Sequence, residues 1–217
     1  MKMGWGKVSE ILGLGTESPL DLEGLPSRLE LRPIPLPGEF DSGYALDEYR
    51  NSLERKGKRT AVGELVYRFK YKCDRDCGSM LAEIAERFVR ENAELRTADL
   101  MITVPPSFTS RPFDPISLLA EEVSRKTNIP YQKGLITRVR LTGLQKKMPD
   151  KKAKIQNVSG AFELTDTDKI KDKRVLLVDD LYASGATINE VARILKARGA
   201  KNVLALILIK TSWIRYS

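Results

Sequence analysis

Histidine is absent from this chain of 217 residues, and its absence excludes several kinds of site. Without imidazole there is no Ser-His-Asp triad, no histidine metal ligand and no histidine acid–base catalyst. Cysteine is also scarce, because Cys73 and Cys77 alone cannot complete a four-ligand zinc site. Their spacing predicts that they share one helical face, as small, reduced, partly buried side chains of a cytosolic protein. A redox or metal role is the alternative.

Long apolar runs are missing as well. No stretch of eighteen apolar residues occurs, so the sequence predicts no transmembrane helix, and residues 1–15 lack the apolar core of a secretory signal. We therefore expect a cytoplasmic protein without membrane contact. The length suffices for one α/β domain with an appendage, and 41% hydrophobic with 30% charged residues is typical of a globular fold.

The N-terminal part is rich in proline, which forbids long helices and favours extended segments. Five prolines lie between residues 19 and 37. Residues 34–40 are interpreted as either an edge strand or a docking arm. We assign residues 1–60 to an N-terminal arm that contributes to a hood, and residues 61–217 to the main domain.

From residue 62 onward, apolar periodicity predicts alternating helices and strands. Helical stripes cover residues 62–69, 78–92, 116–123 and 188–195, and apolar strands cover residues 100–104, 135–139, 161–164, 175–179 and 203–209. Strands separated by helices indicate a parallel sheet with helices on both faces. The predicted fold class is therefore α/β.

Residues 175–187, VLLVDDLYASGAT, form the most informative stretch. Four aliphatic residues predict a strand buried on both faces, which ends at Asp179 and Asp180 and is followed by a small-residue loop and a helix. Small side chains let a ligand approach the backbone, and the first helical amides attract an anion. The two acids accept hydrogen bonds from hydroxyls, so the fitting ligand is a ribose 5-phosphate. An ordinary turn with a solvated acid pair is the alternative.

This stretch resembles the phosphoribosyl pyrophosphate (PRPP) motif of type I phosphoribosyltransferases. The resemblance implies that Asp179 and Asp180 are the catalytic acids that bind the ribose 2- and 3-hydroxyls. It also implies a 5-phosphate loop, made of Ala183, Ser184, Gly185, Ala186 and Thr187. Ala183 departs from the pattern, because relatives commonly have threonine there and one hydroxyl contact is therefore lost.

A second loop, at residues 106–111, follows the strand at 100–104. Loops after parallel strands meet at the same edge of a sheet, so this loop should face residues 179–187. In type I phosphoribosyltransferases the corresponding loop binds pyrophosphate, which assigns Ser107 and Arg111 to that group. A proline-initiated surface turn is the alternative.

Residues 138–162 carry five lysines between 146 and 154, and they predict a loop that is mobile until an anion neutralises it. The segment resembles the hood of the ComF/GntX branch of phosphoribosyltransferases. The resemblance implies that it forms a small hood over the parallel sheet. The resemblance assigns Arg138, Lys146 and Lys147 to pyrophosphate binding and loop closure. It is carried by Arg138, Thr142, Gln145, Asn157, Val158, Gly160, Ala161 and Phe162, and residues 67–71 are similar to an early Leu-Lys-Tyr segment of that branch.

Three departures from the branch are visible. Lys154 stands where the branch has arginine, residues 111–115 read RPFDP in place of Arg-Gly-Phe-Asn-Gln, and there is no four-cysteine zinc module. Functions that depend on that module are therefore in doubt.

The resemblance implies transfer of a phosphoribosyl group from PRPP to an unknown small-molecule acceptor, with release of pyrophosphate. Such a transition state needs charge stabilisation and positioning, which a site without histidine can supply. Mg²⁺ would be bound through PRPP oxygens and water, with no direct protein ligand. The alternative is a non-catalytic PRPP-binding or nucleic-acid-handling protein, favoured by the net charge of +8 but not by the few aromatics of the basic loop. Single-stranded nucleic acid and a second copy of the chain remain open as partners.

Overall fold

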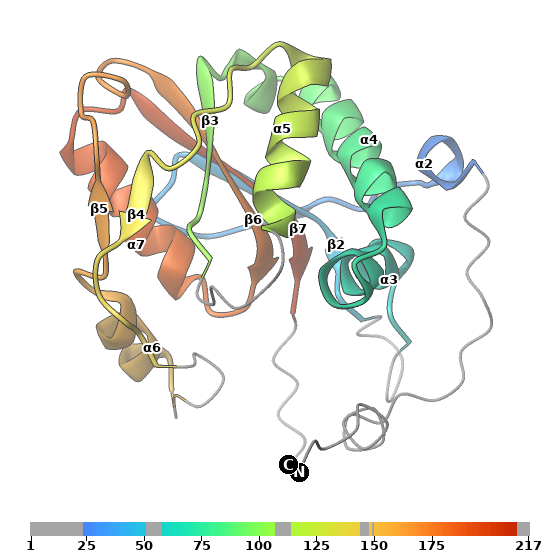
Figure 1. Cartoon of the computed structure of the whole chain (residues 1–217), viewed down its shortest axis with the longest axis horizontal. Coiled ribbons are helices and arrows are strands. Elements are labelled where there is room, and N and C mark those ends of the chain that lie inside the picture. The colour runs from blue at the N-terminus through green and yellow to red at the C-terminus, as the bar shows by residue number, and fades with distance from the viewer. Residues whose placement is uncertain (1–23, 51–57, 107–113, 144–147, 149, 212–217) are drawn as a thin grey trace.

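The computed structural model describes residues 24–50, 58–106, 114–143, 148 and 150–211. Its centre is a five-stranded sheet in the order β1-β2-β7-β6-β3 (Figure 1). Neighbouring strands run parallel, except that β1 is antiparallel to β2. The strands are Ile34–Pro35 (β1), Ser42–Glu48 (β2), Leu100–Thr103 (β3), Arg174–Tyr182 (β6) and Asn202–Lys210 (β7).

Helices cover both faces of this sheet, which confirms the predicted α/β architecture (Figure 1). One face carries Ala61–Tyr67 (α3), the π-helix Arg68–Lys72 (η1), Arg75–Glu91 (α4) and Pro115–Thr127 (α5). The other face carries Ala186–Ala197 (α7) and a small lobe. The short helices Leu25–Arg28 (α2) and Leu95–Thr97 (η2) complete the described elements outside that lobe. Within the described ranges, no helix has both the length and the apolar character needed to cross a bilayer.

Strand β6 explains why its sequence is almost continuously apolar. Leu176 and Val178 contact the core beneath α3, α4 and α5, whereas Val175 and Leu177 contact the core beneath α7. All four side chains are at most 1% exposed. Burying each such side chain contributes about 1.5–3 kcal/mol, so two-sided burial fixes the strand at the sheet centre.

The small lobe is an antiparallel pair, Ile136–Arg138 (β4) and Phe162–Leu164 (β5), with the helix Lys151–Val158 (α6) between them. The two strands were expected, but they form a separate sheet. The prediction of a mobile loop over residues 138–162 is wrong for residues 151–158, which form helix α6, and Asp150 caps this helix by accepting the Ala153 amide at 2.8 Å. Lys154 of α6 is only 4% exposed, which its basic surroundings in the sequence concealed.

Three further expectations need correction. Strand β6 does not end at the acids but continues through them to Tyr182. The segment assigned to an N-terminal arm supplies β2 as well as the edge strand β1. Cys73 and Cys77 do not share a helical face, because Cys73 ends η1 with a φ of 58° and Asp74 starts α4 anew. Both thiols are free, and burial raises the pKa of Cys77 to about 12.

Candidate functional site

A cleft of about 540 Å³ lies at the carboxyl end of β6 and β3, where ligands bind in open α/β sheets. The acid pair, the loop after β6 and the start of α7 form one side of it. The ends of β3 and β4, the start of α5 and η1 form the rest. The residues that line the cleft include Lys70, Pro105, Asp114, Arg138, Thr142, Gly143, Asp179, Asp180, Ala183, Ser184, Gly185, Ala186 and Thr187.

Helix α7 presents its N-terminus to the cleft, where the N-cap residue Gly185 has no side chain to cap it and the Ala186 amide donates to Ser184 Oγ at 3.4 Å. Gly185 precedes it with a φ of 74°, a conformation that glycine adopts without steric cost. A Cβ at Gly185 would also lie 2.6 Å from the Tyr182 hydroxyl, which donates a hydrogen bond of 2.7 Å to the Pro37 carbonyl. Glycine is therefore required by packing and by backbone geometry, and its smallness leaves the helix amides accessible.

The acid pair is held by the backbone of β6. The Asp180 amide donates to Asp179 Oδ1 at 2.8 Å, and the Asp180 carboxylate forms an ion pair with Lys70. Burial, and then the charge of Asp180, raise the pKa of Asp179, against the opposing effect of Lys70 and Arg138. The pair thus offers carboxylate acceptors at a partly buried position, where they suit hydroxyl donors better than anions.

Arg138 connects the small lobe to the loop after β3. Its Nη1 donates to Thr142 Oγ1 at 2.8 Å and its Nη2 to the Pro105 carbonyl at 3.3 Å. Its guanidinium carbon lies 4.5 Å from the centre of the Phe162 ring. Burial lowers the pKa of Arg138, while Asp179 opposes that shift. A guanidinium in this position adds positive charge to the cleft wall opposite the α7 loop.

The structure gives physical reasons for several hood residues found by sequence resemblance. Asn157 donates to the Gly143 carbonyl and accepts from the Gly143 amide, both at 2.9 Å. Gly160 has a φ of 64°, and its amide donates to Glu190 of α7 at 2.9 Å. These contacts attach the residues after β4 to α6, and the turn before β5 to α7.

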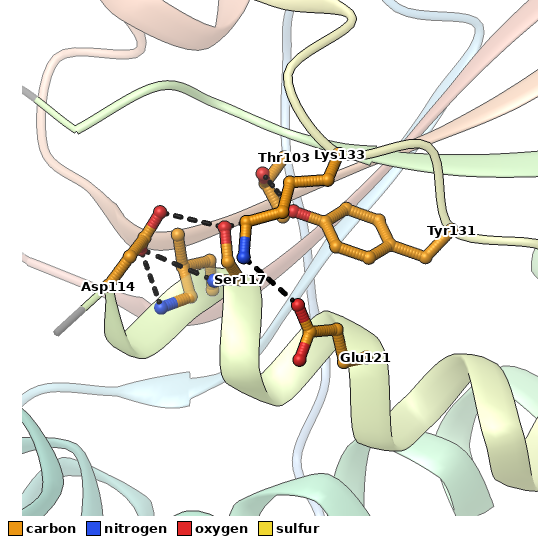
Figure 2. A network of polar contacts seen from close by, with 7 residues as sticks. Thr103, Asp114, Ser117, Glu121, Tyr131 and Lys133 are labelled. Carbon is orange, nitrogen blue, oxygen red and sulfur yellow. Dashed lines mark hydrogen bonds and ion pairs between the residues drawn. The ribbon is translucent and has the colours of Figure 1, made fainter.

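A chain of polar contacts supports the start of α5 (Figure 2). Asp114 caps the helix through the Ile116 and Ser117 amides, and its Oδ2 accepts from Ser117 Oγ at 2.7 Å. The Tyr131 hydroxyl lies 2.9 Å from Ser117 Oγ and 3.0 Å from Thr103 Oγ1. The network thereby connects the end of β3 to the start of α5, the two boundaries of residues 104–114.

The cleft brings together one part of the predicted site. Asp179, Asp180, residues 183–187 and Arg138 all line it, and their roles stay predictions. Ser107, Arg111, Lys146 and Lys147 lie outside the described residues, as does Gln145. In the described part of the chain, no cluster of three or more His, Cys, Asp or Glu side chains is arranged to hold a metal.

Sequence reasoning missed Lys70 and Asp114 as cleft residues. Lys70 lay within residues 67–71, whose similarity to an early segment of the branch was the available signal. Asp114 appeared only as part of a departure from the branch pattern. Neither residue is near residues 179–187 in sequence, so spacing alone could not place them in the cleft.

The fold and cleft define an α/β protein of the type I phosphoribosyltransferase fold, and residues 117–212 match the phosphoribosyl transferase domain family. The chain is 29% identical over 147 residues to Competence protein F of Haemophilus influenzae, which covers 64% of this chain and 63% of that protein. It is 26% identical over 156 residues to the DNA utilization protein YhgH of Shigella flexneri, covering 69% of this chain and 67% of that protein. The predicted resemblance to ComF-like type I phosphoribosyltransferases is thereby confirmed.

A third relative is the amidophosphoribosyltransferase of Pasteurella multocida, 29% identical over 120 residues. The match covers 55% of this chain but only 22% of that protein. The chain thus spans just under two thirds of Competence protein F and less than a quarter of the amidophosphoribosyltransferase.

Proposed function

We propose that the cleft binds PRPP and that the protein transfers its phosphoribosyl group to an acceptor, releasing pyrophosphate. The observation that carries this proposal is that the acid pair of β6 and the N-terminus of α7 face one cleft, with a loop of three residues between β6 and α7. Asp179 and Asp180 accept the ribose hydroxyls, and the loop and first turn of α7, residues 183–187, bind the 5-phosphate.

Pyrophosphate would bind on the opposite wall. Arg138 lines that wall, and Ser107, Arg111, Lys146 and Lys147 are the further candidates. Cationic and amide donors there would stabilise the negative charge that develops on the leaving pyrophosphate. Positioning supplies the remainder, because the ribose must be held with its reacting carbon between the leaving group and the acceptor.

Magnesium fits the oxygen-rich chemistry of this cleft. Mg²⁺ keeps much of its hydration shell, so PRPP oxygens and water would bind it, and the carboxylates of Asp179 and Asp180 can accept hydrogen bonds from such waters. When bound, the ion would neutralise charge on the pyrophosphate group.

A thermal-shift titration tests the ligand. PRPP with Mg²⁺ should raise the melting temperature of the wild type, since a ligand that binds only the folded state stabilises it by RT ln(1 + [L]/Kd). Asp180→Asn combined with Thr187→Ala should remove the shift. Asp76→Asn, an exposed acid on α4, is the control that should retain it. If millimolar PRPP leaves the wild type unchanged, the ligand assignment is wrong.

A pyrophosphate-release screen with PRPP and a panel of nucleobases and amines tests the reaction. Release that depends on one acceptor class, and disappears in Asp179→Asn, would support the transferase function. PRPP binding without release from any acceptor would leave a non-catalytic PRPP-binding protein.

The second candidate is a nucleic-acid-handling protein. It is favoured by the names of two relatives, Competence protein F and DNA utilization protein YhgH, and by the net charge of +8. Binding of single-stranded DNA that weakens steeply with salt, together with an absence of pyrophosphate release, would support this function over transfer.

A further inference from the structure

The π-helix η1 brings a lysine to the cleft wall. It continues α3, which starts after Thr60, whose Oγ1 accepts the Gly63 amide at 3.0 Å. A π-helix closes its hydrogen bonds over one more residue than an α-helix, and such turns are frequent at functional sites. In η1, Phe69 is buried in the core while the next residue, Lys70, lines the cleft.

Packing around Phe69 fixes where Lys70 lies. Phe69 is 5% exposed, and a Cβ on Gly78 of α4 would come within 2.5 Å of its ring. The absence of a side chain at Gly78 therefore leaves the space that Phe69 fills. Because Phe69 is locked in the core, the backbone of the neighbouring Lys70 is set by the fold.

The Lys70 ammonium forms an ion pair with the Asp180 carboxylate, and the side chains are only 16% and 21% exposed. Burial disfavours the charge of Lys70, but Asp180 outweighs this effect and the pKa of the ammonium is raised. A pair this far from solvent is screened less than a surface pair, so each partner strongly affects the other.

The two acids differ in what compensates them. Asp179 accepts the Asp180 amide and is near Arg138, whereas Asp180 bonds directly to Lys70. Adjacent carboxylates at the end of a buried strand repel each other, so removal of the cation on Asp180 would leave two acids in conflict. Lys70 is thus the group on which the arrangement of Asp180 depends.

We infer that Lys70 is a positioning residue, which compensates the charge of Asp180 and holds its carboxylate ready to accept a ribose hydroxyl. A carboxylate has about four acceptor sites, so Asp180 can bind Lys70 and a hydroxyl together. Lys70 therefore acts through Asp180. The inference rests on the proposed function for the identity of the ligand, but the contact itself can be tested without ligand.

The ligand-free test is a double-mutant cycle of Lys70→Met and Asp180→Asn, read as melting temperatures. Lys70→Met should lower the melting temperature of the wild type by about 2–4 °C, because Asp180 loses its counter-ion. In the Asp180→Asn background the same change should have little effect. Equal losses in both backgrounds would overturn the inference.

The ligand test measures PRPP affinity by calorimetry in the presence of Mg²⁺. Lys70→Met should weaken binding about tenfold, as expected when a charge-assisted contact loses its orientation, and Lys70→Arg should restore most of the loss. Lys72→Met is the matched control: Lys72 lies in η1 but is exposed, so its loss should leave affinity unchanged. Equal affinities of Lys70→Met and Lys72→Met would overturn the role.

The two tests separate failure of the inference from failure of the proposed function. If the wild type does not bind PRPP but Lys70 and Asp180 are energetically coupled, PRPP is not the ligand and the positioning contact is supported. A wild type that binds PRPP without that coupling refutes the role of Lys70 and leaves the proposed function standing.

Discussion

The two sides of the cleft are built in different ways. The side formed by β6, its loop and α7 is one continuous piece of chain whose geometry follows from a buried strand, a glycine with positive φ and a helix start. The opposite side is assembled from separate segments by side chains, with Arg138 bonded to Thr142 and Pro105 and with Asn157 bonded to Gly143. The first side is therefore built by backbone and core packing, whereas the second depends on polar contacts.

This difference predicts where the protein tolerates change. Core packing tolerates little, because interiors are close-packed and a single added atom is felt. Hydrogen bonds at exposed positions each contribute about 1 kcal/mol to stability, so their loss should destabilise the small lobe, the predicted hood, without unfolding the central sheet.

The largest effect should come from Gly185→Ala, which attacks the continuous side. The new Cβ meets the Tyr182 hydroxyl at 2.6 Å and forces alanine to adopt a φ of 74°. We expect the free energy of unfolding to fall by about 2–4 kcal/mol, from backbone strain and overpacking together. Chemical denaturation measures the change.

Gly134→Ala is the matched control, because Gly134 has a φ of 72° but no heavy atom within 4 Å of an added Cβ. It isolates the backbone cost, about 1–2 kcal/mol. Similar losses in the two variants would show that the contact with Tyr182 does not require a small residue at position 185.

Asp179→Asn should stabilise the ligand-free protein in a pH-dependent way. Burial and Asp180 raise the pKa of Asp179 above its ordinary value of 3.8, so above that pH the folded chain holds a proton that the unfolded chain has lost. Unfolding free energy therefore falls as pH rises toward the folded-state pKa. The free energy of unfolding of the variant should exceed that of the wild type by about 1–2 kcal/mol at pH 8 and by almost nothing at pH 4.

Denaturation curves at the two pH values check this expectation, with Asp76→Asn as a control for the removal of an exposed carboxylate. A variant that is destabilised at pH 8 would contradict it. Loss of the PRPP response in the same variant would then show that the acid costs stability because its carboxylate serves the ligand.

Asn157→Ala tests the assembled side. The change removes both hydrogen bonds with the Gly143 backbone, and we expect the free energy of unfolding to fall by about 1–2 kcal/mol. Hydrogen exchange should accelerate at residues 139–143 and remain slow in β6 and β7. Asn157→Asp keeps an acceptor for the Gly143 amide, so its stability should lie between that of the wild type and that of Asn157→Ala. Equal acceleration in β6 would mean that the hood and the sheet unfold together.

The same difference explains what the sequence could predict. The strand, acids, loop and helix of residues 174–197 could be predicted because each is indicated by neighbouring residues in the sequence: an apolar run, two acids, small residues and helical periodicity. Helix α6 was missed because its lysines masked a segment that buries Lys154 and is capped by Asp150. Lys70 was missed because its contact with Asp180 spans most of the domain in sequence. Long-range polar contacts leave no periodic signal, so only the folded chain reveals them.

The smallest effects should come from two contacts beside the start of α5, and Tyr131→Phe removes the first of them. The lost hydroxyl contacts Ser117 and Thr103 in a part-buried network, so we expect a loss of about 0.5–1.5 kcal/mol (Figure 2). Lys133→Met breaks an ion pair with Glu121 beside it, where the side chains are 65% and 44% exposed, and should lower the free energy of unfolding less than Tyr131→Phe does, because solvent screens the pair. Denaturation of both variants orders the two contacts. If Lys133→Met costs more, the Tyr131 network does not support the start of α5, and Asp114 must be held at the cleft by its capping bonds alone.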